Sequence, residues 1–131
     1  SANHNFASDT FKLALYTASP YTTASTVYVV TSETTGTEYS AGGNTLSGNA
    51  VSNVADIATV DFTDSVWGSP TPATFSAAYG TLYNSSATNK LIVVLDFGGT
   101  KSCSNGTFTV TFPSPTSGSP SGADALLSIT S

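Results

Sequence analysis

Short runs of β-branched and aromatic residues, separated by turn-forming residues, limit what this chain can fold into. The run Phe11–Tyr16 alternates apolar with other residues, and Phe108–Phe112 places Phe108, Val110 and Phe112 on one face. Alternation with a period of two is typical of half-buried β-strands. Apart from a short turn expected over residues 5–10, no window keeps the 3.6-residue period of a helix. The sequence therefore predicts an all-β fold.

Further strand-like runs follow at intervals typical of all-β domains. Leu91–Leu95 is continuously apolar, which predicts a strand buried on both faces. In the long run Thr74–Tyr83, Gly80 predicts a β-bulge, and Asn105-Gly106 predicts a hairpin turn. The remaining expected strands are Val27–Val30, Thr45–Ser47, Ala50–Val54, Thr59–Phe62 and Ala125–Ile129. About seven to nine antiparallel strands predict a β-sandwich or a jelly-roll-like domain.

The chain is long enough for one domain, and its composition marks two peripheral segments. We assign all 131 residues to a single β domain with one core. Residues 1–10 are largely polar and predict an N-terminal arm. Residues 114–123 consist almost entirely of Ser, Pro, Thr and Gly, which predicts a flexible loop rather than a domain boundary, because a strand-like run follows.

Charged residues are scarce, which excludes two classes of partner. Only 8% of the residues are charged, three of them are Lys or Arg, and the formal net charge is −5. Binding to nucleic acid or to an anionic membrane surface needs clustered cations, so we expect neither. Ser and Thr make up about a third of the chain, as suits strands with Thr on the solvent face. Scarcity of Lys and Glu favours surfaces that contact other proteins.

The residues that usually carry chemistry are too few to form a site. The chain has one histidine, His4, and one cysteine, Cys103. A zinc site needs several such ligands, and a catalytic nucleophile needs a base beside it. We therefore expect no metal, no cofactor and no catalytic residue, and we predict that the protein is not an enzyme.

Two carboxylates and one tryptophan are the residues that leave alternatives open. Asp61 and Asp64 could form the carboxylate pair of a glycosidase, but we favour a structural role in the turn before Trp67. Glu33 and Glu38, in a Thr/Gly-rich stretch, complete the acidic candidates. For Trp67 we favour packing in the core, and the alternative is a sugar-stacking or protein-contact platform shared with tyrosines.

Several short motifs occur in an order that resembles one family. They are Asn5-Phe6, Thr10–Tyr16, Gly36–Gly43, Leu46–Gly48, Ala58–Phe62, Thr74–Ala77, Leu82–Asn84, Leu95–Gly99 and Asn105–Pro113. Together they resemble a widespread family of small virion structural proteins of tailed bacteriophages, the capsid decoration or cement proteins. The resemblance covers most of residues 5–113. Tyr79, where a basic residue is frequent, and a longer loop after Pro113 depart from the pattern and affect surface contacts rather than the core.

The resemblance implies a structural role on a viral shell. A protein of this kind is located on the capsid surface, binds the major capsid protein, stabilises the head and forms a homotrimer. It contributes no catalytic residues. We expect the arm and exposed side chains to carry the contacts, and name as interface residues Asn3, His4, Asn5, Phe6, Trp67 and Tyr79. The alternative function is a carbohydrate-binding or adhesive module of a phage tail or fibre.

Overall fold

The computed structural model describes residues 4–54, 57–112 and 128–130, and within these ranges the regular structure consists of antiparallel strands without a helix. The strands are β1 (Phe11–Tyr16), β2 (Asn44–Thr45), β3 (Ala50–Val54), β4 (Ile57–Asp61), β5 (Ser65–Trp67), β6 (Ala73–Asn84), β7 (Lys90–Gly106), β8 (Phe108–Thr111) and β9 (Ser128–Thr130). The prediction of an all-β fold is confirmed. Asn3, the expected loop at 114–123 and residues 125–127 lie outside the described ranges.

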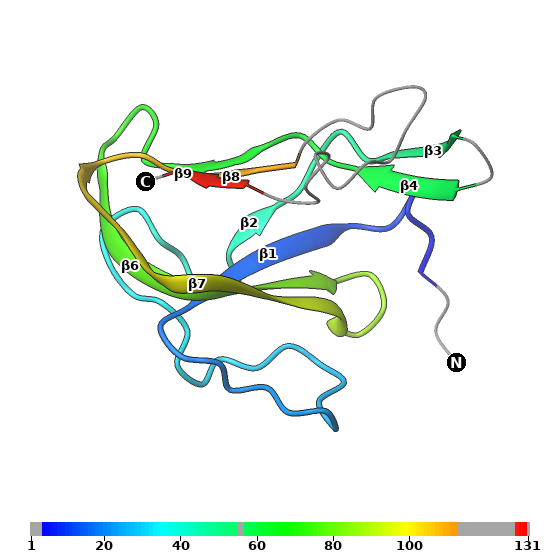
Figure 1. Ribbon diagram of the computed structural model, residues 1–131, viewed down its shortest axis with the longest axis horizontal. Coiled ribbons are helices and arrows are strands. Elements are labelled where there is room, and N and C mark those ends of the chain that lie inside the picture. The colour runs from blue at the N-terminus through cyan, green and yellow to red at the C-terminus, as the bar shows by residue number, and fades with distance from the viewer. Residues whose placement is uncertain (1–3, 55–56, 113–127, 131) are drawn as a thin grey trace.

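The strands form three sheets (Figure 1). One has the order β2-β1-β6-β7, the second is the hairpin β3-β4, and the third has the order β5-β8-β9. In Figure 1 the sheet of β5, β8 and β9 lies over the sheet that contains β1, β6 and β7. The expected short turn near the N-terminus is also present, because the amides of Ser8 and Asp9 both donate to the Asn5 carbonyl oxygen.

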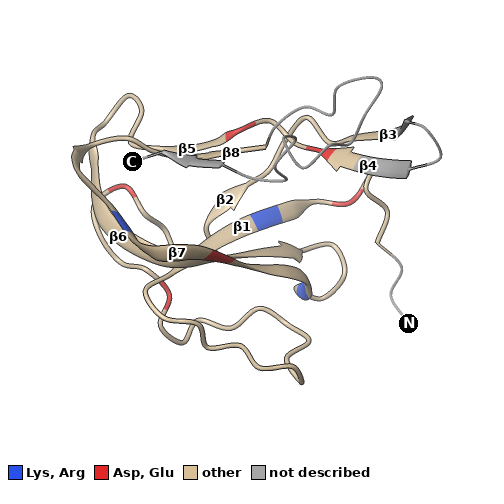
Figure 2. Cartoon of the chain, viewed as in Figure 1, with Lys and Arg blue, Asp and Glu red and all other residues tan. Residues whose placement is uncertain are grey.

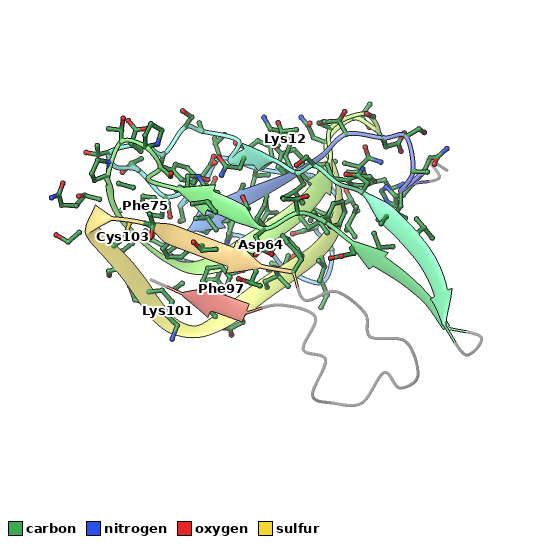
Figure 3. The ribbon with its side chains drawn as sticks, turned by 90° about the horizontal axis from the view of Figure 1, so that it is seen from above. Lys12, Asp64, Phe75, Phe97, Lys101 and Cys103 are labelled. Carbon is green, nitrogen blue, oxygen red and sulfur yellow. The ribbon has the colours of Figure 1, made fainter. Side chains whose placement is uncertain are left out.

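The apolar residues between these layers come from the alternating runs. On β1, Phe11, Leu13 and Leu15 are fully buried in the main core, and on β8 Phe108 and Val110 are fully buried in it. Several ring pairs in this core meet edge to face, among them Trp67 with Phe75 and Trp67 with Phe108, a geometry that aromatic side chains favour. Figure 3 shows the molecule from above, with β8 and β9 in front of β7. Alternation therefore identified the inward faces of β1 and β8 correctly.

The chain crosses between the layers at one corner. β7 ends at Gly106 and β8 begins at Phe108, but β7 pairs with β6, whereas β8 pairs with β5 and β9. The predicted hairpin turn at Asn105-Gly106 is therefore wrong. Positive φ at Asn105 changes the chain direction here, and the same geometry that favours Asn-Gly in hairpins serves a sheet-to-sheet corner. Gly68 lies at the same corner, where a Cβ would collide with the Gly106 carbonyl oxygen.

The β6–β7 ladder is irregular, although not at Gly80. Gly80 pairs regularly with Leu95, so the predicted bulge is wrong at this position. The absence of a side chain at Gly80 leaves room for the Phe97 ring, which packs on the core: a Cβ at Gly80 would lie 3.0 Å from this ring, so the ring would have to shift. The main irregularity lies at Ala78. Ala77 pairs with Lys101 and Tyr79 pairs with Asp96, so β7 has four residues between these two pairs where β6 has one.

The long connection between β1 and β2, residues 17–43, contains no strand, and we call it the strap. Val27–Val30 lies within it, so the strand predicted there is wrong: Val27 forms an isolated bridge to Lys90, and Val30 is 67% exposed. A run of β-branched residues forms a strand only if its side chains find a buried surface. In Figure 1 the first part of the strap lies on the side of the four-stranded sheet that faces away from β8, and its last part rises to β2. Tyr39, in this last part, packs against the main core.

β7 is also more exposed than its sequence indicated. Leu91–Leu95 forms part of a strand as predicted, but β7 is the outer strand of its sheet, and Val94 is 37% exposed. The expectation of burial on both faces is therefore wrong. A continuously apolar run is weak evidence for an interior strand rather than a helix, and it does not tell an interior strand from an edge strand.

Candidate functional site

The N-terminal residues predicted to contact a partner lie on the body of the domain. Asn5 is exposed, whereas the Phe6 ring is half-buried and stacks on Phe11 with the ring centres 5.0 Å apart. The Asn84 Nδ2 atom lies 3.1 Å from Nδ1 of His4. Residues 4–10 therefore form a surface with a defined conformation, on which Asn5 is available for contact. Asn3 lies outside the described residues.

Asp9 fixes this segment to the turn that connects β6 and β7. Its carboxylate accepts hydrogen bonds from the Asn5 backbone N–H at 2.9 Å and from Asn84 Nδ2 at 2.7 Å. These donors, the backbone N–H of Asn5 first, lower the pKa of Asp9 because they stabilise its ionised form. Asn84 itself is fully buried and accepts from the backbone N–H groups of Ser86 and Ala87. The position of residues 4–10 is thus specified by hydrogen bonds.

Trp67 belongs to the core. It is 3% exposed and packs on Phe75 and Phe108 at ring-centre distances of 6.2 and 6.1 Å. The packing interpretation that the sequence favoured is the one the structure supports, and a side chain so buried offers no platform to a sugar. Tyr79, the other named aromatic residue, is half-buried on the opposite side of the four-stranded sheet.

We expect the fluorescence of Trp67, the single tryptophan, to report this burial. Acrylamide should quench it several-fold less in the native protein than in urea, because a residue that is 3% exposed rarely meets the quencher. Stern–Volmer titration measures the difference. The Val66→Ala variant, which truncates a neighbouring side chain that is 44% exposed, serves as the control and should leave the native value unchanged. Equal quenching in native and unfolded protein would contradict the assigned position.

The two aspartates that could have formed a carboxylate pair each accept a hydrogen bond from the backbone. The Asp61 carboxylate accepts from the backbone N–H of Phe62, and Asp64 accepts from the backbone N–H of Phe112 at 3.0 Å. Asp64 therefore joins the segments before β5 and after β8, a long-range role rather than the local turn we expected. Glu38 is exposed, and Cys103 is buried opposite Phe75. Among the described residues no group of three His, Cys, Asp or Glu side chains could hold a metal ion.

The Glu33 carboxylate accepts three hydrogen bonds, a structural role that we did not predict from the sequence. Its Oε2 atom accepts from the Tyr28 hydroxyl at 2.6 Å, and its Oε1 atom accepts from the Tyr39 hydroxyl at 2.8 Å and from the Gly42 backbone N–H at 2.7 Å. Three points of the strap thus meet at one carboxylate. A carboxylate followed by tyrosines in a segment without strand pattern was the signal in the sequence that could have indicated this cluster.

The tyrosines around Glu33 are held in their neutral form. Burial is the largest cause that raises the pKa of Tyr28, and its hydrogen bond to Glu33 is the second. Burial is also the largest cause of the raised pKa values of Tyr16 and Tyr39. Burial together with the charge of Glu33 raises the pKa of Tyr83 to about 12. A phenol that donates to a carboxylate loses that hydrogen bond when it ionises, so the cluster stabilises the protonated tyrosines.

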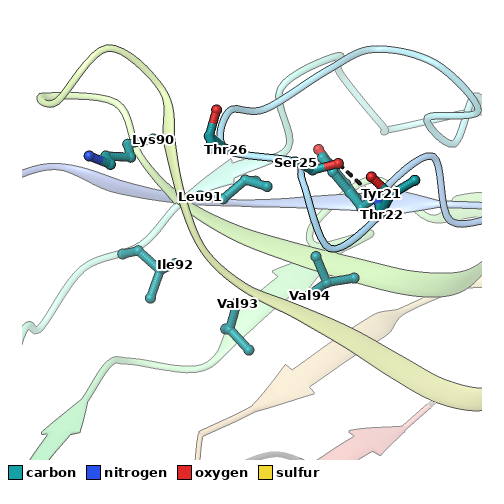
Figure 4. A pocket seen from close by; sticks show the side chains of 9 residues that line it. All are labelled: Tyr21, Thr22, Ser25, Thr26, Lys90, Leu91, Ile92, Val93 and Val94. Carbon is teal, nitrogen blue, oxygen red and sulfur yellow. Dashed lines mark hydrogen bonds between the residues drawn. The ribbon is translucent and has the colours of Figure 1, made fainter.

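An open groove of about 280 Å³ lies between the strap and β7 (Figure 4). Hydroxyl-bearing residues line one side and the β7 run Lys90–Val94 lines the other; the residues on the strap side are Tyr21, Thr22, Ser25 and Thr26. Lys90 is the charged residue among them. The groove therefore presents hydroxyl groups, one ammonium group and apolar side chains.

The surface as a whole carries few charges (Figure 2). The lysines and the acidic residues of the described ranges are scattered over separate strands and loops rather than gathered on one face. Among these residues no helix is long and apolar enough to cross a membrane. No protein-family model, curated protein or solved structure matches the chain.

Proposed function

We propose that this protein is a structural component of a bacteriophage virion, a cement protein that binds the major capsid protein on the outside of the head and stabilises the shell. The ordered set of motifs over residues 5–113 carries this proposal. In this proposal the protein acts as a homotrimer and catalyses no reaction. Many copies that each bridge neighbouring shell subunits raise the stability of the shell by mass action.

Three features of the molecule support the proposal. The two facing layers of antiparallel strands, joined at the Gly106 corner, are what we interpret as a β-sandwich. Sparse charge and abundant hydroxyls suit a surface that packs closely on neighbours. Residues 4–10, with Asn5 exposed and the segment fixed through Asp9, supply a preorganised contact, which lowers the entropy lost on binding.

The alternative function, a carbohydrate-binding module on a tail or fibre, is less well supported because its main sugar-binding candidate is buried. The platform suggested for it depended on Trp67, which is 3% exposed. A sugar-binding role would therefore need a different set of aromatic residues. We favour the capsid role because it relies on surfaces rather than on one aromatic side chain.

Electron microscopy of the virion tests the proposal directly. We expect density for this chain on the outside of the head, at three-fold or quasi-three-fold positions of the shell. A location in the tail, or absence from the particle, would refute it.

A binding assay with shells that lack the protein tests the contact surface. Ser8→Lys places a cation in the exposed part of residues 4–10 and should weaken binding about tenfold, or about 1.4 kcal/mol. The matched control is Thr100→Lys, another exposed position, which follows Gly98-Gly99 in the middle of β7, where a Cβ on either glycine would meet nothing within 4 Å. If both variants bind alike, residues 4–10 are not the contact, even if the protein is located on the head.

A further inference from the structure

The outer edge of β7 is the longest strand edge of the four-stranded sheet. β7 (Lys90–Gly106) stands last in the order β2-β1-β6-β7, so among the described residues no further strand of the sheet lies beside it. Backbone N–H and C=O groups along such an edge need hydrogen-bond partners, and an apolar edge pairs readily with a strand of another molecule. Whatever covers this edge therefore determines whether it can pair with another molecule.

The strap covers the first part of the edge. The Tyr28 backbone N–H donates to the Asn89 carbonyl oxygen at 2.9 Å, and the Leu91 N–H donates to the Thr26 carbonyl oxygen at 2.9 Å. Between these two bonds Val27 forms an antiparallel bridge with Lys90. Residues 26–28 thus act as a short substitute for a neighbouring strand, although they are not part of the sheet.

Side chains of the strap hold this cover in place. The Tyr28 ring stacks on Tyr83 with a centre distance of 4.6 Å, and its hydroxyl donates to Glu33. The adjacent residue, Val29, is bonded through its carbonyl oxygen to the Tyr16 hydroxyl and through its N–H to the Tyr21 hydroxyl. The cover therefore depends on polar bonds to a few tyrosines and one carboxylate, and not on burial of its valines, because Val27 is 44% exposed.

Beyond Leu91 the strap departs from β7 and the groove opens (Figure 4). The edge next to the groove is apolar: Ile92, Val93 and Leu95 are half-buried, and Val94 is 37% exposed. Lys90 precedes this uncharged stretch and Asp96 follows it. The edge is thus partly covered by polar contacts and partly open, with opposite charges at its two ends.

We propose that the strap is a releasable cover of residues 89–91, and that after its release the whole β7 edge over residues 89–96 pairs antiparallel with the same edge of a second copy of this chain. The charges select the partner and its direction. In an antiparallel pair the Lys90 end of one copy meets the Asp96 end of the other, whereas a parallel pair would bring like charges together. Two identical edges related by a two-fold axis form a closed dimer.

Glu33→Gln is the variant that releases the cover. An amide keeps the size of the side chain, but it loses the charge and brings an NH₂ group toward the donors Tyr28, Tyr39 and the Gly42 N–H. We expect the particle mass measured by light scattering to double relative to the wild type at equal concentration. Glu38→Gln, the same change at an exposed glutamate of the strap, is the matched control and should leave the mass unchanged.

A reversible cross-link shows whether the same edge is responsible. Val27 and Lys90 form a non-hydrogen-bonded antiparallel pair, a geometry with Cα atoms about 4.5 Å apart that accepts a disulfide. In the Glu33→Gln background, Val27→Cys with Lys90→Cys should stay at the wild-type mass when oxidised and associate when reduced. Because the oxidised and the reduced protein both lack the Lys90 charge, a difference in mass between them cannot come from its loss.

Three results would overturn the proposal. The first is a Glu33→Gln variant that keeps its β-sheet circular dichroism and does not associate. The second is association that is equal in the oxidised and the reduced cross-linked protein. If Glu33→Gln does not fold, hydrogen exchange of the wild type decides: the Tyr28 and Leu91 amides should exchange together and faster than the β6–β7 ladder. The third contradicting result is that the Tyr28 and Leu91 amides exchange only when the whole protein unfolds.

Discussion

Replacing Phe108 with alanine should destabilise the fold by about 3–5 kcal/mol, a large share of the roughly 5–15 kcal/mol that holds a typical domain together. Phe108 is fully buried, and its ring lies 5.1 Å from that of Phe75 and 6.4 Å from that of Phe97. Loss of the ring removes these contacts and leaves a cavity between the two layers. Equilibrium unfolding in urea measures the change as a lower midpoint at a similar slope.

Val66→Ala is the control for this experiment. Val66 lies on β5, pairs with Thr109 of β8 and is 44% exposed, so its truncation should cost less than about 1 kcal/mol. If Phe108→Ala were as mild as this control, the aromatic cluster between the layers would not be the centre of the core.

Alkaline pH should unfold the protein over a narrow range. The pKa values of Tyr16, Tyr28, Tyr39 and Tyr83 are raised in the folded state above the value of about 10 for an unfolded chain. The folded state therefore binds more protons above pH ~10, so its stability is fully present below that pH and is lost as the pH rises toward the folded pKa values. Each tyrosine that stays protonated contributes a slope of about 1.4 kcal/mol per pH unit.

Urea unfolding at a series of pH values measures this slope. With four raised tyrosines the stability should fall by up to about 5 kcal/mol per pH unit above pH ~10. Tyr28→Phe keeps the ring that stacks on Tyr83 and removes one ionisable group, so the slope should decrease by about one proton. A slope identical to that of the wild type would show that Tyr28 titrates as it does in the unfolded chain.

The sequence was informative wherever one side of a strand faces the core. Period-two alternation located β1 and β8 and the residues that each turns to the main core. On β1 it missed that Ala14 and Tyr16, on the other face, are also fully buried, in a second cluster. The same pattern could not determine which strands lie next to each other in a sheet. Leu91–Leu95 is as apolar as an interior strand, but the sheet order places it at an edge. Strand order depends on contacts between distant residues, which local periodicity does not contain.

The candidate surfaces were less predictable than the strands. Glu33 and its tyrosines lie in a segment whose β-branched run suggested a strand, and their hydrogen bonds are made to side chains rather than along a ladder. Residues 5–10 were expected in an arm, and the turn within them was anticipated from local spacing. The contacts of this segment with Asn84, by contrast, depend on the return of the chain about eighty residues later, so no local pattern indicates them.

The central position of β1 has a consequence for synthesis. Its pairing along the full strand is with β6, from Phe11 opposite Asn84 to Tyr16 opposite Tyr79, whereas β2 pairs with two of its residues. A ribosome must therefore complete β6 before the earliest apolar strand gains its main partner. Until then Phe11, Leu13 and Leu15 remain available to other nascent chains, because closing so long a loop is slow and the exposed run favours aggregation. Translation speed through β6 should therefore affect the yield of native protein.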